Sequence, residues 1–218
     1  MREHLLTVAA FGLVLGATLP LQAQTLRPAF AAGMGVIYRS VPDVITVVNS
    51  TPGALERLPQ FSAGVEFFAA ASYPLDASWV LKVDYGYQIT SLNIASVLET
   101  AQFTLTQHCP TLVIQYVLSN QGVFNVKAGA GMGYHFGHLA KKFFYIDNSF
   151  SAQGPAFLAE LEGNTAFGDH LFACLGVSAV WSLIGSLKDA AGLTSTGEAV
   201  TLNSHGVGAR LGFTYYLN

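Results

Sequence analysis

The sequence predicts an all-β fold, namely an eight-stranded antiparallel up-and-down transmembrane β-barrel. Three observations predict it: apolar residues alternate along each strand, long and short connections alternate, and outward aromatic residues gather at two levels. The composition agrees, because charged residues make up 11% and hydrophobic residues 51% of the 218, whereas soluble domains average about 25% charged residues. The mean hydropathy is +0.43. After the N-terminus, no run of about 18 apolar residues indicates a membrane helix.

Residues 1–23 have the features of a secretory signal peptide. Arg2 supplies a positive start, residues 5–19 form an apolar region, and the sequence that ends at Ala23 resembles a cleavage site. A membrane-anchor helix is the alternative, although the apolar run is short for one. We therefore expect residues 24–218 to form one exported barrel domain.

The last segment, residues 205–218, shows the alternation most clearly. Every second residue from Val207 to Leu217 is apolar, and the residues between them include two glycines and a single charge, Arg210. Successive side chains of a strand point to opposite faces. The apolar face is therefore expected to contact lipid, and the small, polar face to fill a narrow lumen. Residues 123–136 repeat the pattern, and their glycines lack the following helix that a phosphate-binding loop requires.

The same alternation predicts eight strands, at residues 27–40, 60–73, 78–92, 100–118, 123–136, 151–167, 170–183 and 205–218. In the fourth strand the apolar parity changes around Pro110, and proline cannot donate to a ladder, so we expect a bulge there. Segments 41–58, 138–150 and 184–204 are expected to be long loops, with a short strand extension at 44–48 as one option. Long loops are expected outside the cell and short turns in the periplasm.

Twelve aromatic residues of outward parity lie near the two ends of the strands. They are Phe30, Tyr38, Phe61, Tyr73, Trp79, Tyr87, Tyr116, Phe124, Phe136, Phe167, Trp181 and Tyr215. Phe30 to Tyr38 rises roughly 20 Å, at about 3.3 Å per residue and a tilt near 40°, and the apolar band of such barrels is about 25 Å tall. We expect two aromatic girdles at the membrane interfaces, since a general preference of aromatic residues for strands does not predict one face and two levels.

This pattern resembles the small outer-membrane β-barrel proteins of the OmpA/OmpX-like kind, over residues 27–218. The resemblance implies a bacterial outer-membrane location, contact with outer-membrane lipid, and assembly by the barrel-assembly machinery, which reads an alternating aromatic strand at the C-terminus. Phe213 and Tyr215 match that strand, whereas the final Leu217 and Asn218 depart from a terminal aromatic residue. A monomer is expected. Nucleic acid is not an expected partner, because the net charge is −3 and no basic stripe is visible.

Eight charged residues have inward parity, four of each sign. They are Arg39, Glu66, Lys82, Asp84, Lys127, Glu160, Glu162 and Arg210. Buried charges need partners because their desolvation is costly, and an eight-stranded barrel has room for little beyond its own side chains. We therefore expect a salt-bridged plug in which Arg210 shares a level with Glu66 and Glu160. A polar permeation path is the alternative.

The remaining residues give no expectation of a catalytic, metal or cofactor site. His135 and His138 are expected to face opposite sides of one strand, which argues against a shared metal, and His205 lies near the same rim. Cys109 and Cys174 are expected to be two separate buried thiols, with a bridge across the lumen as the alternative. The basic, aromatic segment 141–145 is either a hairpin tip or a contact for lipid phosphates.

The expected function is a structural or surface-interaction role without catalysis. A small-solute or hydrophobic-compound channel is the first alternative, and an outer-membrane lipid-modifying enzyme the second. A soluble lipocalin-like carrier is a further one, which would need the opposite polarity of the two faces.

Overall fold

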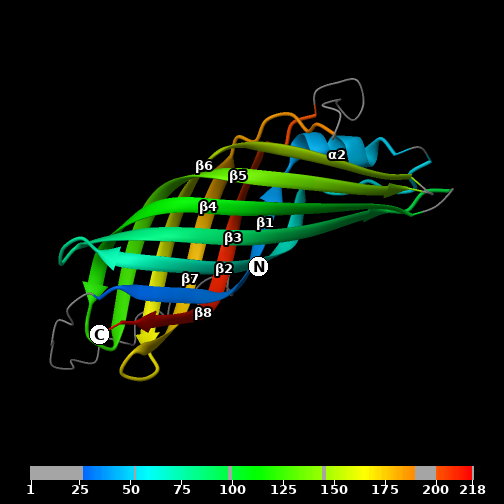
Figure 1. Ribbon diagram of the computed structural model, residues 1–218. Coiled ribbons are helices and arrows are strands. Elements are labelled where there is room, and N and C mark those ends of the chain that lie inside the picture. The colour runs from blue at the N-terminus through cyan, green and yellow to red at the C-terminus, as the bar shows by residue number, and fades with distance from the viewer. Residues whose placement is uncertain (1–26, 52, 98–99, 144–145, 190–199, 218) are drawn as a thin grey trace, which may run out of the picture.

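The computed structural model describes residues 27–51, 53–97, 100–143, 146–189 and 200–217, and the expected signal segment lies outside them. The described residues form a closed barrel of eight antiparallel strands, in which each strand pairs with its neighbours in the chain and β8 closes on β1 (Figure 1). The strands are β1 (Ala29–Ser40), β2 (Phe61–Pro74), β3 (Trp79–Ile94), β4 (Ala101–Asn120), β5 (Phe124–Phe143), β6 (Ile146–Ala166), β7 (Leu171–Ser182) and β8 (Ser204–Tyr216). The predicted fold class is confirmed.

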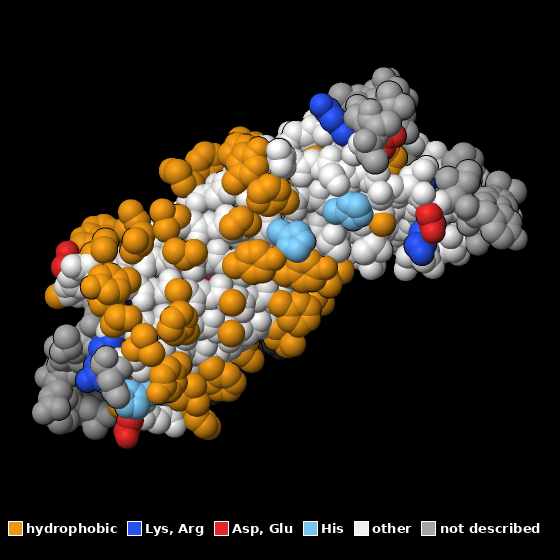
Figure 2. Space-filling view, in the orientation of Figure 1, with side chains coloured by type: hydrophobic (Ala, Val, Ile, Leu, Met, Phe, Trp, Pro, Cys, Tyr) orange, Lys and Arg blue, Asp and Glu red, His pale blue; other side chains and the backbone are white. Residues whose placement is uncertain are grey.

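The outer surface of the barrel is apolar over most of its length. At the junction that closes the barrel, Met34 pairs with Leu211 and both side chains are exposed, while the next residue, Arg210, is buried. Figure 2 shows apolar side chains as a broad band that stops short of one end of the molecule. So large an apolar surface is unfavourable in water, so this band is the lipid-facing surface of a transmembrane barrel. Among the described residues, no helix is long and apolar enough to cross a membrane.

The two ends of the barrel differ. The turns between β2 and β3, β4 and β5, and β6 and β7 lie at one end, called here the turn end, and the opposite end is the loop end. At the loop end, β3 to β6 extend beyond the other strands (Figure 1). The prediction of a loop at 138–150 is wrong, because β5 and β6 stay paired from Gly137–Ala152 to Phe143–Ile146. Side chains still alternate between the two faces here, with Leu139 buried and Lys142 exposed. The strands stay paired because the extended hairpin has an inner face that is buried.

Helix α2 (Pro42–Asn49) occupies the segment for which a strand extension at 44–48 was one option. Pro42 suits the first turn, where its missing N–H is not needed. Val44, Ile45 and Val48 fall on one face at helical spacing and are at most 4% exposed. The weak helix propensity of these β-branched residues is outweighed because the face they form is buried.

The buried face of α2 belongs to a hydrophobic core that fills the loop end of the barrel. This loop-end core comprises Val41, Val44, Ile45, Val48, Leu92, Ile94, Ala101, Phe103, Leu105, Leu139, Phe150, Ile184, Leu187, Val200 and Leu202. The carboxylate of Asp43 accepts a hydrogen bond from the backbone N–H of Thr201 at 3.1 Å, which ties α2 to the segment before β8. The core and α2 together cover the mouth of the barrel.

The expected bulge at Pro110 is wrong. The register of β4 with β3 runs through Tyr85–Pro110 without a shift, and the register shift of β4 with β5 lies between Val117 and Ser119, close to the turn. Phe103 and Leu105 keep inward parity and are buried in the loop-end core. The apparent change of parity arises because the lumen itself becomes apolar towards the loop end.

Candidate functional site

The structure places all eight charged residues of inward parity inside the barrel. Seven are at most 8% exposed as whole residues, and the side chain of Glu160 is 5% exposed. They come from six strands: β1, β2, β3, β5, β6 and β8. Strand alternation alone brings them together, because every one of these positions faces the axis of the barrel.

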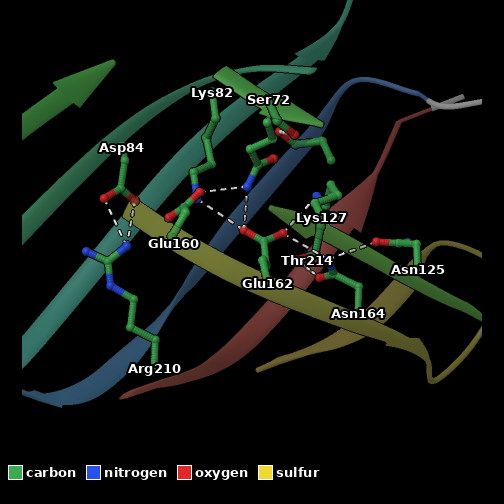
Figure 3. Close-up of polar contacts among 12 residues, drawn as sticks. Ser72, Lys82, Asp84, Asn125, Lys127, Glu160, Glu162, Asn164, Arg210 and Thr214 are labelled. Atoms are coloured by element: carbon green, nitrogen blue, oxygen red, sulfur yellow. Dashed lines mark hydrogen bonds and ion pairs between the residues drawn. The ribbon is translucent and has the colours of Figure 1, made fainter. Parts of the chain in front are cut away.

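The cluster nearest the turn end contains two ammonium groups and two carboxylates. Lys82 forms ion pairs with Glu160 and, at 3.1 Å, with Glu162, and Lys127 lies 2.7 Å from the other oxygen of Glu162 (Figure 3). The Gln115 side-chain amide donates to Glu160 at 2.7 Å and to Glu162 at 3.2 Å. The four charges of this cluster sum to zero.

A layer of uncharged polar side chains continues this cluster towards the turn end. The Asn164 amide donates to Glu162 at 2.8 Å and to Asn125 at 3.1 Å, and the Thr214 hydroxyl donates to Asn164 at 2.8 Å (Figure 3). The Asn125 amide donates in turn to the Tyr216 hydroxyl at 3.2 Å. The residues of this layer were not among the predicted lumen residues, although their inward parity was the signal that could have found them.

The central cluster surrounds Arg210. Its Nε and Nη2 atoms donate to Glu66 at 2.7 and 3.0 Å, and its Nη1 atom donates to both oxygens of Asp84 at 3.1 and 2.9 Å. Its guanidinium carbon lies 5.0 Å from the centroid of the Phe68 ring. A Cβ atom at Gly86 would lie 2.9 Å from Glu66 Oε1, so the absence of a side chain there leaves room for this pair.

One of the two carboxylate partners of Arg210 differs from the prediction. Asp84 takes the place that was expected for Glu160, and Glu160 contacts Lys82 instead. The predicted level of each residue was counted along its strand from the nearest turn, which ignores the stagger of strands that a closed barrel requires. The error in the predicted level grows around the circumference from β8 to β6.

Arg39 lies closest to the loop end and has uncharged partners among the described residues. Its Nη1 atom donates to Gln88 at 3.0 Å and to Gln107, and its Nη2 atom donates to Thr90 at 3.1 Å. The Gln88 amide donates onward to Glu66 at 2.8 Å. Because the central cluster holds one cation and two carboxylates, Arg39 balances its excess negative charge through Gln88. The four cations and four carboxylates of the lumen then sum to zero.

Little space remains between these side chains. A cavity of about 20 Å³ is lined by Lys82, Asp84, Glu162 and Arg210, among others. A cavity needs roughly 10–15 Å³ to hold one water molecule, so this one holds about one.

Eleven of the twelve aromatic residues of the expected girdles lie on the outward side of their strands, and Phe167 follows the end of β6. At the turn end, Trp79 packs edge-on against Tyr116, with ring centroids 5.0 Å apart. At the loop end, Tyr38 stacks on Phe61 at 5.2 Å. Phe61 and Tyr87 are half-buried by such neighbours, and the other ten are exposed, namely Phe30, Tyr38, Tyr73, Trp79, Tyr116, Phe124, Phe136, Phe167, Trp181 and Tyr215.

The cysteines and histidines lie in different environments. Cys109 and Cys174 are free and buried, so the prediction of two separate thiols is confirmed. His135 faces inward and its Nδ1 atom lies 3.0 Å from the Ser182 hydroxyl oxygen, whereas His138 is exposed. His205 is also exposed, edge-on to a ring of the aromatic girdle. In the described part of the chain, no three metal-binding side chains gather.

Comparisons with known proteins show likeness in structure. No family model matches the sequence, and no curated protein matches it. Ail, the attachment invasion locus protein of Yersinia pestis, was solved with the heparin analogue sucrose octasulfate and matches with a TM-score of 0.52 at 11% identity, covering 88% of this chain and all of its own. Neisserial surface protein A matches with a TM-score of 0.56 at 11% identity over 89% of this chain and 99% of its own.

A major outer membrane protein from Thermus thermophilus matches with a TM-score of 0.51 at 14% identity, over 88% of this chain and all of its own. Identities this low show the fold alone. The chain therefore has the fold of the small eight-stranded outer-membrane β-barrels.

Proposed function

We propose that this chain is a bacterial outer-membrane β-barrel protein with a structural or surface-interaction role, whose lumen is closed by its own paired charges. The observation that carries the proposal is the charge-neutral network of eight buried side chains around a cavity of about 20 Å³. Ions or solutes would have to separate these pairs to pass, and separating a buried pair is costly.

The outer membrane is the proposed location because of the apolar band and the fold. Closed barrels satisfy every backbone hydrogen bond within lipid, and aromatic residues line both edges of the band. The structural neighbours include a bacterial surface protein and a major outer membrane protein. By the rule that barrels of this kind have short periplasmic turns, the loop end faces the exterior.

The loop end supports a surface-interaction role because it is long and internally packed. From Phe136, at the edge of the apolar band, β5 continues to Phe143, which is about 23 Å along the strand at roughly 3.3 Å per residue. The loop-end core and α2 hold this projection together. A surface that is ordered before binding loses less conformational freedom when a partner binds.

Conductance across planar lipid bilayers tests the proposal against the channel alternative. Purified, folded protein is added to one side, with a general porin as the positive control and circular dichroism as the check of β structure. The expected result is a bilayer without stable current steps. Reproducible ohmic steps from the folded protein would overturn the closed lumen.

A further inference from the structure

We propose that a cavity on the outward face of the barrel, at the loop-end edge of the apolar band, binds the phosphate group of an anionic membrane lipid. The cavity has a volume of about 640 Å³, and its polar lining comes from His108, His138, Ser151, Gln153, Ser186 and Lys188. The proposal depends on the transmembrane placement of the barrel and is independent of whether the lumen conducts.

The chain after β7 builds one side of this cavity. Leu183 still donates its N–H to Pro155 on β6 at 2.8 Å, and further on Ser151 and Lys188 exchange two backbone hydrogen bonds of 2.8 and 3.0 Å. Gly185, which also lines the cavity, has no side chain to fill the space. This irregular continuation sets Lys188 directly opposite Ser151.

The cavity lies at the depth expected for lipid headgroups. Phe136, an aromatic residue at the edge of the apolar band, lines its lower side and pairs with Gln153. The next outward pair, His138 and Ser151, lies two residues further, or about 7 Å along the strands. The headgroup region adds roughly 5–8 Å to each side of the hydrocarbon core. In Figure 2, histidine side chains lie at the edge of the apolar band.

The lining groups suit a phosphate. Lys188 supplies an exposed ammonium group, and Ser151, Ser186 and Gln153 supply neutral donors. No carboxylate occurs among the described residues that line the cavity. Phosphate oxygens take charge-assisted hydrogen bonds from such groups, and cationic pockets at the membrane surface bind lipid headgroups.

The basic segment 141–145 is less suited to this role. Lys142 lies four residues beyond His138 near the end of the β5–β6 hairpin, about 13 Å further along the strand, and it pairs with Asp147 at 3.8 Å. Lys141 lies over the ring of Phe103, which belongs to the loop-end core. Lys142 is therefore a matched control for Lys188, being an exposed lysine of the same end outside the cavity.

The same cavity also holds a pair of groups with a second chemistry. His138 Nδ1 lies 3.1 Å from the Ser151 hydroxyl oxygen, which is the geometry of a base and a nucleophile. No carboxylate that would orient the imidazole lines this cavity among the described residues, so binding is the better-supported role. Ester cleavage remains an outcome of the test.

Quenching of tryptophan fluorescence by brominated lipid provides the test. The chain has two tryptophans, and Trp79→Phe leaves only Trp181, which is exposed and pairs with Phe157 below the cavity. This protein is reconstituted into phosphatidylcholine vesicles that contain either brominated phosphatidic acid or brominated phosphatidylcholine. The acyl chains of a lipid held in the cavity would run past Trp181.

We expect phosphatidic acid to associate near Trp181 several-fold more strongly than phosphatidylcholine does. Lys188→Gln should bring the ratio of the two association constants close to one, and Lys142→Gln should leave the preference intact. Equal quenching by the two lipids in the protein with both lysines would overturn the proposal. An equal loss in both lysine variants would also overturn it, because general charge would then explain the preference.

Two further readouts exclude other sources of the effect. Loss of the preference in millimolar inorganic phosphate would show a site for free phosphate and overturn the lipid assignment. Release of fatty acid, abolished by Ser151→Ala, would overturn simple binding in favour of ester cleavage. Conductance recorded on the same vesicles reports separately on the closed lumen, so the two proposals fail independently.

Discussion

Replacement of Arg210 by alanine should destabilise the barrel more than removal of any exposed charge. A guanidinium can donate at most five hydrogen bonds. That of Arg210 donates four, two to Glu66 and two to Asp84, and 8% of the residue is exposed. After Arg210→Ala, Glu66 keeps its bond from Gln88, whereas Asp84 loses both of its hydrogen bonds to Arg210. Breaking a buried pair in this way costs about 3–5 kcal/mol.

Lys142→Ala is the matched control. Its side chain is 64% exposed and its partner Asp147 is 71% exposed at a separation of 3.8 Å, and such surface pairs are worth under about 1 kcal/mol. Arg210→Lys should recover only part of the loss, because one ammonium group cannot reproduce the forked contacts of a guanidinium.

The free energy of unfolding is measured by urea titration in lipid vesicles, with tryptophan fluorescence and the gel mobility of folded barrels as two readouts. We expect Arg210→Ala to lower it by several times the effect of Lys142→Ala. Equal effects of the two substitutions would refute the reasoning, since Arg210 would then lie in a solvated lumen and its carboxylate partners would not need it.

Three further outcomes are expected. Gly86→Ala should lower the free energy of unfolding in urea, because its Cβ would lie 2.9 Å from Glu66 Oε1. Gly176→Ala meets nothing nearer than 3.7 Å and should be close to neutral. Equal stability of the two variants would contradict close packing around the Arg210–Glu66 pair. Val44→Asp should expose α2 to added protease while leaving membrane insertion intact, and the exposed control Thr46→Asp should not. Removal of residues 213–218 should block insertion, measured as protease-resistant protein in purified membranes, because the end of β8 then leaves unpaired backbone groups of β1 and β7 in lipid.

The barrel could be predicted from the sequence because period-two alternation and turn spacing are local properties. The alternation in residues 205–218 sufficed to assign both faces of β8, and the structure keeps that assignment from Val207 to Tyr215. The inward parity of the charged residues followed from the same rule. The pair of Arg210 with Glu66 was also predicted. The contact of Arg210 with Asp84 was not, because such contacts depend on the stagger of strands around the barrel.

The loop end was less predictable because its elements are decided by packing between distant segments. Five of the eight residues of α2 are β-branched. The burial of Val44 and Val48 in the loop-end core outweighs their weak helix propensity. The apolar parity of the fourth strand changes in the sequence because Phe103 faces inward, at the point where the lumen becomes apolar. Lys188 gave no signal at all, since its place beside Ser151 comes from an irregular continuation of β7.

The two native cysteines offer the most direct test of a closed lumen. Cys109 and Cys174 face inward on opposite sides of the network, at 4% and 3% exposure. Folded protein in detergent is treated with a small, charged, water-soluble methanethiosulfonate and the adducts are counted by mass spectrometry, with Lys142→Cys as the exposed control. The account predicts that only the introduced cysteine reacts until urea unfolds the barrel. Prompt reaction of Cys109 and Cys174 in the folded protein would show a water-filled lumen and contradict it.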